Sequence, residues 1–249
     1  MAAQPIEPGV AHERGLTTTA EAQKPYHHGH LRDALIAAGM QLIADDGLEK
    51  LTIRALAERV GVSHAAPQYH FPGKAALIVA IATRGFEQLG SALQAPWTSS
   101  AATPAERLTA MGQAYVDFAF ANTARYRLMF ATGIPGQKAD SDQFCDAAAR
   151  TFDLLNNAIA AVVGAPAPSD PVASDAERAK IQGAAFFAWS AVHGAIMLQL
   201  DGTFSSLHDE GEGHASLPPM QQLMPALLGH VAIGLGVAAA TNDAAAGNT

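Results

Sequence analysis

Apolar residues recur along this chain every three to four positions, and that spacing predicts helices over most of its length. No stretch alternates apolar and polar residues in the way that a half-buried β-strand requires. The predicted helices cover about 31–44, 52–60, 74–94, 105–122, 124–131, 140–163, 177–200 and 220–238, with a further short helix that starts at 64. The sequence therefore predicts an all-α protein.

The stretch Thr52–Lys74 carries two short helices joined by a tight turn. Thr52 can cap the first helix through its hydroxyl, and Gly61 supplies the left-handed residue with which helices commonly end. Ser63 can then cap a second helix that begins at His64. This order predicts a helix-turn-helix, whose second helix enters the major groove of DNA, although helical hairpins of other function share the arrangement.

The residues that follow the second helix make the motif specific. The run from Tyr69 to Lys74 reads Y-H-F-P-x-K, and over roughly 26–86 the chain resembles the tetracycline-repressor (TetR) family of transcriptional regulators. The resemblance implies a three-helix DNA-binding domain followed by a helical bundle. The predicted parts are a disordered arm at 1–25, a helix-turn-helix domain at 26–73, a ligand-binding and dimerisation domain at 74–240, and a disordered tail at 241–249.

The second short helix and its flanks carry residue types that suit DNA recognition. Gln68 can pair with adenine through two hydrogen bonds, and the methyl group of Ala65 can meet that of a thymine. Lys74 stands near the start of the next helix, where backbone N–H groups already favour a phosphate. For His70 the resemblance implies a phosphate contact, with a buried histidine as the alternative. The predicted DNA contacts are Thr52, Ser63, His64, Ala65, Gln68, Tyr69, His70 and Lys74.

Two positions depart from the usual pattern of the family. Gln68 occupies a place that is commonly a tyrosine, so an aromatic backbone contact is replaced by a side chain that can read bases. Pro67 has no N–H and cannot donate to the Ser63 carbonyl, so we expect the second helix to start tightly or one residue late.

Composition adds a condition to the DNA-binding hypothesis. Hydrophobic residues make up 49% of the chain and charged residues 15%, which suits a compact helical protein, but the net charge of −8 does not favour a nucleic-acid partner. Residues 24–90 are close to neutral, with seven basic and six acidic side chains, and the excess of acids lies in 91–249. The N-terminal end is therefore the expected DNA-binding face.

The single Cys145 excludes an internal disulfide framework and fits a reducing compartment. It is expected to be a small buried side chain, with a reactive sensor thiol as the alternative. The first residues lack the basic start and apolar core of a secretory signal, and no run approaches the roughly 20 apolar residues of a membrane span. We therefore expect a soluble, cytoplasmic protein without a membrane partner.

The predicted helix at 177–200 is the second informative element. Trp189 and His193 lie one turn apart on an apolar face, and the run W-x-x-x-H-G resembles a C-terminal subclass of the TetR family named for those letters. The imidazole could bind an effector or be a hydrogen-bonded core histidine, and both interpretations stay open. Gly183 and Gly194 would allow a neighbouring helix to approach closely.

The resemblance implies a ligand pocket among the middle helices and a homodimer formed by the last two long helices. Aromatic and methionine walls with few polar groups suit a small apolar effector. The predicted pocket residues are Tyr115, Phe118, Met129, Phe130, Phe144, Phe152, Trp189 and His193. The functional hypothesis is a DNA-binding regulator, a repressor that a small-molecule effector releases from a palindromic operator.

Two other classes of function remain. One is a constitutive DNA-binding or partner-binding helical protein without an effector. The other is a helical-bundle metal enzyme that uses some of the histidines, but the sequence has no Glu-x-x-His or His-Glu-x-x-His pair to hold a metal. The histidines considered are His27, His28, His30, His193, His208 and His214. No catalytic residue, metal site or cofactor is predicted, and the protein is not expected to be an enzyme.

Overall fold

The computed structural model describes residues 30–98, 102–131, 141–202 and 220–235. Within these ranges every regular element is a helix, which confirms the predicted all-α class. The predicted arm at 1–25 and tail at 241–249 lie outside the described residues. The α-helices are α1 (Leu31–Asp46), α2 (Ile53–Val60), α3 (Ala66–His70), α4 (Lys74–Gln94), α5 (Pro104–Ala121), α6 (Thr123–Phe130), α7 (Asp142–Val163), α8 (Asp175–Leu200) and α10 (Met220–Gly234), and the 3-10 helices are η2 (Leu48–Lys50) and η3 (Ala95–Thr98).

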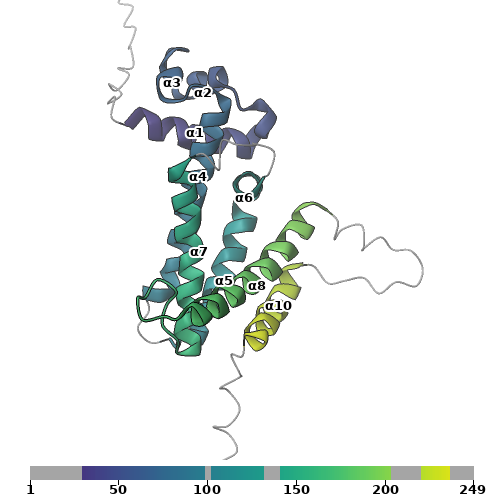
Figure 1. Cartoon of the computed structure of the whole chain (residues 1–249). Coiled ribbons are helices and arrows are strands. Elements are labelled where there is room, and N and C mark those ends of the chain that lie inside the picture. Colours follow the sequence, from purple (N-terminus) through teal and green to yellow (C-terminus); the bar gives the residue numbers. More distant parts are fainter. Residues whose placement is uncertain (1–29, 99–101, 132–140, 203–219, 236–249) are drawn as a thin grey trace, which may run out of the picture.

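The helices form a small head on a longer body (Figure 1). Helices α1, α2 and α3 make the head at the top of the view, and α4 runs from it down the body beside α7. Helix α5 packs against α4 and α7, and α8 and α10 pack against each other at the end far from α3. Helix α4 is therefore the element that joins the head to the body.

Local capping by side chains fixes the starts of α2, α5, α7 and α8. Thr103 and Glu106 form a reciprocal capping box at the start of α5, with Pro104 in the first turn. Ser174 and Glu177 form the same box at the start of α8. Such caps satisfy backbone N–H groups that have no partner within the helix, which is why these starts are visible in sequence.

Helix α3 begins two residues later than the sequence predicts. The side chain of Ser63 does not cap it; the Ser63 carbonyl instead accepts a hydrogen bond from the N–H of Ala66 in a turn. The reason is Pro67, which has no N–H to donate and is tolerated only in the first turn of a helix. His64 and Ala65 therefore belong to the turn rather than to the helix.

Two hydrophobic cores lie along the chain. The head core contains fully buried leucines of α1 and α2 together with Phe71 and the first two turns of α4. The body core contains the rest of α4 and the inner faces of α5, α7, α8 and α10. Helix α6 contributes to both cores, with Ala124 and Leu128 facing the head and Tyr126 and Met129 facing the body.

One expectation about the body needs correction, and one helix of the body bears on the expectation of no membrane span. Cys145 is exposed on α7, where the buried interpretation had placed it in the core. Helix α8 is long and apolar enough, by length and composition, to cross a membrane, although no uninterrupted apolar run of that length is present. Its many alanines raise the average hydropathy around polar residues such as Gln182 and His193. The core helix of a soluble protein meets the same criterion, so this is weak evidence for a membrane span.

Candidate functional site

The turn between α2 and α3 is fixed by hydrogen bonds that the sequence anticipates. The N–H of Ala55 donates to the hydroxyl of Thr52 at 3.0 Å, which caps α2. Gly61 has φ 74° and ends α2, and the N–H groups of Gly61 and Val62 both donate to the carbonyl of Ala57. Because these bonds involve neighbouring residues only, the angle between the two helices is set locally.

The predicted DNA contacts gather at this end of the molecule, on α2, α3, the turn between them and the start of α4. Gln68 and Tyr69 project from α3 into solvent, and the Tyr69 side chain is 95% exposed. His70 is half-buried, and Phe71 behind it is in the core. The amine of Lys74 donates to the backbone carbonyl of Leu48 at 2.9 Å, so it ties the start of α4 to η2, which follows α1.

Several cations of the head are engaged in ion pairs. Arg54 pairs with Glu58 at 3.0 Å, Arg59 pairs with Asp45, and Arg84 pairs with Asp33 at 2.6 Å. The guanidinium of Arg32 lies over the ring of Phe71, 5.5 Å from its centroid. The three ion pairs offset part of the local positive charge, whereas Arg32, Lys50 and Lys74 have no acidic partner among the described residues.

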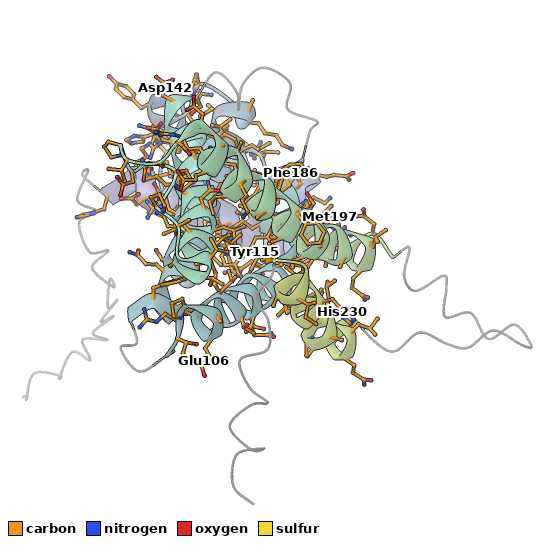
Figure 2. The ribbon with its side chains drawn as sticks, turned by 60° about the horizontal axis from the view of Figure 1, so that its bottom comes forward. Glu106, Tyr115, Asp142, Phe186, Met197 and His230 are labelled. Carbon is orange, nitrogen blue, oxygen red and sulfur yellow. The ribbon has the colours of Figure 1, made fainter. Side chains whose placement is uncertain are left out.

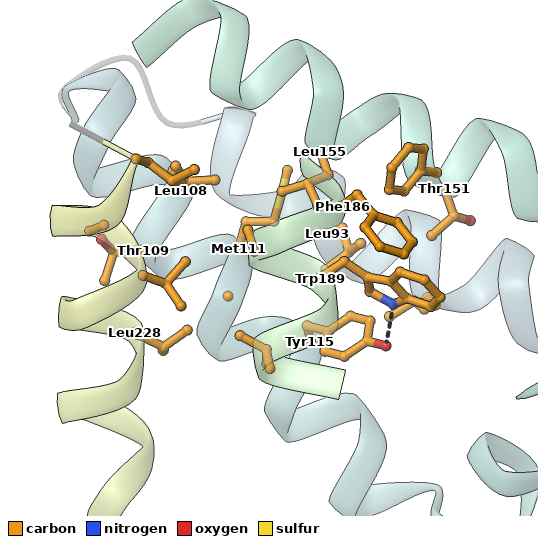
Figure 3. A pocket seen from close by; sticks show the side chains of 18 of the residues that line it. Leu93, Leu108, Thr109, Met111, Tyr115, Thr151, Leu155, Phe186, Trp189 and Leu228 are labelled. Atoms are coloured by element: carbon orange, nitrogen blue, oxygen red, sulfur yellow. Dashed lines mark hydrogen bonds between the residues drawn. The ribbon is translucent and has the colours of Figure 1, made fainter. Parts of the chain in front are cut away.

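A cavity of about 450 Å³ lies in the body between α4, α5, α7, α8 and α10 (Figure 3). Its walls are formed almost entirely by aliphatic and aromatic side chains. The lining residues are Phe86, Leu89, Leu93, Leu108, Thr109, Met111, Gly112, Tyr115, Phe130, Ala148, Ala149, Thr151, Phe152, Leu155, Phe186, Ala188, Trp189, Val192, Leu228, Val231, Ala232 and Leu235. This size and composition are typical of a site for a small apolar molecule.

Half of the predicted pocket residues line this cavity: Tyr115, Phe130, Phe152 and Trp189.

Four predicted residues do not line it. Met129 is buried between α6 and α4, against Gly85, and Phe118 is buried in the body core. Phe144 packs with its edge on Phe86, with the ring centroids 5.5 Å apart. His193 lies behind the wall, stacked on Trp189 with a centroid separation of 5.1 Å.

A hydrogen-bonded cluster of four side chains backs the cavity. The indole N–H of Trp189 donates to the Tyr115 hydroxyl at 3.1 Å, and the hydroxyls of Tyr115 and Tyr126 are 2.8 Å apart. His193 Nδ1 is 2.6 Å from the Tyr126 hydroxyl and 3.1 Å from that of Tyr115. The Tyr115 hydroxyl, the Tyr126 hydroxyl and His193 Nδ1 thus lie within hydrogen-bond distance of one another, and the direction of these bonds is set by which nitrogen of His193 carries the proton.

Burial keeps this cluster uncharged. Loss of solvation raises the pKa of Tyr115 to about 12 and also raises the pKa of Tyr126, which the neighbouring Tyr115 raises further. Burial lowers the pKa of His193 below its ordinary 6.5. Both phenols and the imidazole are therefore neutral at neutral pH. The sequence leaves two interpretations of His193 open, an effector contact and a hydrogen-bonded core histidine. In the structure His193 is hydrogen-bonded to the tyrosines and stacked on Trp189, so it supports a residue of the cavity wall.

Sequence reasoning missed most of the aliphatic wall. Met111 and Leu108 lie on α5 one and two turns before Tyr115, and Phe186 and Val192 lie three residues either side of Trp189 on α8. Extending the face that Tyr115 and Trp189 share would have found them.

The described residues contain no group of three His, Cys, Asp or Glu side chains that could hold a metal ion. Four of the histidines considered for a metal site, His27, His28, His208 and His214, lie outside the described ranges.

Comparison with known families gives two matches. Residues 35–81 match the model described as bacterial regulatory proteins, tetR family, and residues 108–217 match the model described as tetracyclin repressor-like, C-terminal domain. The first match covers α1 to the head-facing part of α4, and the second includes α5 to α8, which supply most of the cavity wall.

Individual relatives agree with these matches. The HTH-type transcriptional regulator Rv1816 of Mycobacterium tuberculosis is 22% identical over 190 residues, which cover 69% of this chain and 81% of that protein. The class C tetracycline repressor protein of Escherichia coli is 47% identical over 51 residues, 20% of this chain and 23% of its own. A solved structure of a protein of unknown function from Rhodococcus sp. RHA1 superposes with a TM-score of 0.63 at 28% identity, covering 85% of this chain and 98% of the other.

Proposed function

We propose that this chain, which belongs to the TetR family of DNA-binding transcriptional regulators, is a repressor that leaves a palindromic operator when a small molecule enters the cavity of its body. The observation that carries the proposal is the position of α6. Phe130 of α6 lines the cavity, while Leu128 of the same helix is buried in the head core. A molecule that displaces Phe130 therefore acts on a helix that packs under the DNA-binding head.

Polar contacts tie α6 to α8 at two further points. The hydroxyl of Tyr126 bonds to His193, and Arg127 donates to the Leu200 carbonyl and pairs with Asp201 at 3.3 Å. All three partners lie on α8 or directly after it, so a shift of α8 around a ligand would displace α6. Coupling of this kind requires that the ligand favour one of two arrangements of these helices, and that DNA favour the other.

The proposed division of labour keeps 26–73 as the DNA-binding domain and 74–240 as the ligand-binding and dimerisation domain. The two domains share part of one core, because the hydrophobic core of the head includes α4 as far as Ile81 and Leu128 of α6, which both belong to 74–240. On the DNA, we assign base reading to His64, Ala65 and Gln68 and phosphate contacts to the other predicted residues.

The outer face of α8 supports a homodimer. Phe186, Phe187 and Leu198 on α8 are 50–60% exposed, and Ile233 on α10 is 67% exposed. Figure 2 shows Phe186 and Met197 along α8, with α10 beside it. Apolar residues grouped in this way mark a surface that another chain covers, and a second copy would place two heads on a two-fold symmetric operator.

The two glycines of α8 fit the same face. A Cβ atom added at Gly183 or Gly194 would meet nothing within 4 Å among the described atoms of this chain. No described helix of the same protomer makes the close approach that the sequence predicts at these glycines, and we assign it to the partner's copy of the same helix.

The test combines operator binding with release. Fluorescence anisotropy with a duplex from the region upstream of the gene should show binding that is selective for sequence and weakens steeply with salt. Compounds that raise the thermal stability of the protein should then lower its affinity for that duplex. If compounds bind and stabilise the protein while operator affinity stays constant, the protein is a constitutive DNA-binding protein and the release mechanism is wrong.

A further inference from the structure

The threonine hydroxyls in the cavity wall donate their hydrogens to hydrogen bonds within the protein. The hydroxyl of Thr109 donates to the Ala105 carbonyl at 3.1 Å. The hydroxyl of Thr151 donates to the Ala147 carbonyl at 2.8 Å, with the Phe86 carbonyl 3.2 Å away. Both bonds hold the hydroxyl hydrogen on backbone oxygens of the protein.

The indole N–H of Trp189 and the hydroxyl of Tyr115 also form hydrogen bonds within the protein. The indole N–H of Trp189 donates to the Tyr115 hydroxyl, as Figure 3 shows, and that hydroxyl also lies within hydrogen-bond distance of the Tyr126 hydroxyl and of His193 Nδ1. The pKa of Tyr115, raised to about 12, keeps that hydroxyl neutral. Backbone N–H groups of the wall lie within helices and bond along them. The wall thus retains acceptor lone pairs but presents no uncommitted hydrogen-bond donor among its described side chains.

Charge is missing from the same surface. None of the described residues that line the cavity is Asp, Glu, Lys, Arg or His. An anionic group placed there would lose its hydration and find neither a cation nor a donor in exchange. A neutral ring system would lose little and would contact the rings of Phe130, Phe152 and Trp189.

We propose that the cavity selects uncharged, hydrophobic ligands of aromatic or polycyclic type and rejects molecules that carry a carboxylate, sulfonate or phosphate. This inference rests on the proposed function, because it names the chemical class of the effector. It goes further because it names the cause of the selectivity: Thr109, Thr151, Tyr115 and Trp189 are already hydrogen-bonded within the protein, so they do not donate to an anionic ligand group.

A pair of fluorescent molecules tests the selectivity directly. N-phenyl-1-naphthylamine and 1-anilinonaphthalene-8-sulfonate share one ring skeleton and differ by a sulfonate. The Trp97→Phe variant leaves Trp189 as the single tryptophan, so energy transfer from tryptophan to probe reports binding in the part of the body around Trp189, and substitutions in the cavity wall localise that binding to the cavity. In titrations of this full-length variant we expect the neutral probe to bind at least tenfold more tightly than the sulfonate.

Substitutions of one wall residue test whether a positive charge added to the cavity allows the sulfonate probe to bind. Leu155 is half-buried on α7 and has no acidic residue one turn before or after it. In the Trp97→Phe background, Leu155→Arg should bring the two affinities to within about threefold by strengthening sulfonate binding, since it supplies a cation and donors. The matched Leu155→Gln variant loses the same leucine without adding charge and should keep the preference for the neutral probe. Ala148→Arg makes the same test from a smaller side chain if Leu155→Arg fails to fold.

The outcomes separate this inference from the proposed function. Equal affinities for both probes in the Trp97→Phe protein would overturn the selectivity while leaving the cavity as a ligand site. Failure of both probes to accept energy from Trp189 would overturn the cavity as an apolar ligand site altogether. Selective binding of the neutral probe without any change in operator affinity would support the inference and contradict the release mechanism.

Discussion

The head and the body of this protein bury their apolar residues in different ways. In the head, Leu35, Leu51, Leu56 and Leu77 are fully buried and pack against one another and against Phe71. In the body, aromatic rings and leucines surround about 450 Å³ of cavity. A surface that must read bases gains from a filled and rigid core, whereas a domain that must accept a guest needs space that its own side chains leave open.

The first prediction compares one substitution in the two regions. Leu56→Ala removes a fully buried side chain of the head, so we expect it to lower the free energy of unfolding by about 2–5 kcal/mol. Leu155→Ala removes a half-buried side chain that already borders the cavity, and we expect roughly half that loss. Urea unfolding at one fixed protomer concentration measures both. Equal losses would mean that the body core is as tightly packed as the head core.

The second prediction asks whether DNA recognition is confined to the head. Gln68→Ala should cost about 1–3 kcal/mol on the preferred operator and change which operator is preferred, because it removes a base contact. Lys74→Ala and Lys50→Ala should weaken all duplexes about equally and reduce the salt dependence by about one phosphate contact. Lys74→Ala should also lower thermal stability, since its bond to the Leu48 carbonyl is lost.

The control for this set is ligand binding. All three head variants should bind the neutral naphthylamine probe as the parent protein does. The division between reading and anchoring residues fails if Gln68→Ala and Lys50→Ala alter operator preference in the same way.

The third prediction tests the contact between α4 and α6. A Cβ atom at Gly85 would lie 2.6 Å from Met129 Sδ, so Gly85→Ala has to displace that side chain. Overpacking of this kind costs about 1–3 kcal/mol, which exceeds the roughly 1 kcal/mol that alanine gains over glycine in a helix. Gly90→Ala on the same helix meets its nearest atom, Thr151 Oγ1, at 3.5 Å and should be neutral or stabilising. Thermal unfolding of the two variants in parallel measures the difference, and equal melting temperatures would show that Met129 moves without cost.

The fourth and smallest effect concerns pH. Burial lowers the pKa of His193 below 6.5, so the folded protein binds fewer protons there than the unfolded chain. Its contribution to stability is therefore complete above pH 6.5 and is lost as the pH falls from 6.5 towards the folded pKa. Unfolding midpoints at pH 7.5 and pH 5.5 should fall less in His193→Gln than in the parent protein. Identical pH dependence would show that His193 titrates as it does in the unfolded chain.

Sequence reasoning succeeded where local interactions decide the structure. Thr52 and Gly61 fix the two ends of α2 through bonds to residues three and four positions away, and the sequence displays those spacings. Pro67 shows the limit of the same reasoning. It predicts a delay at the start of α3, but the size of the delay depends on how the turn before it closes.

The cavity could be predicted only in part, because packing between distant helices decides which side of each helix faces it. Tyr115 and Trp189 were identified from their chemistry, and they do line the cavity. Met129 has suitable chemistry but points at Gly85, a contact between residues 44 positions apart that no local pattern reveals. Leu228 joins the wall because Gly112 lets α10 come close to α5, with 2.7 Å between its Cδ2 and the position a Cβ would take.

The shared helix α6 has a consequence for building chimaeras between members of this family. A cut between residues 73 and 74 separates the head from the body along the chain, but Ala124 and Leu128 of α6 stay behind as part of the head core. A transplanted head would meet foreign residues at those two positions. Grafts should therefore carry 124 and 128 with the head, and their success would depend on two residues far from the junction rather than on the junction itself.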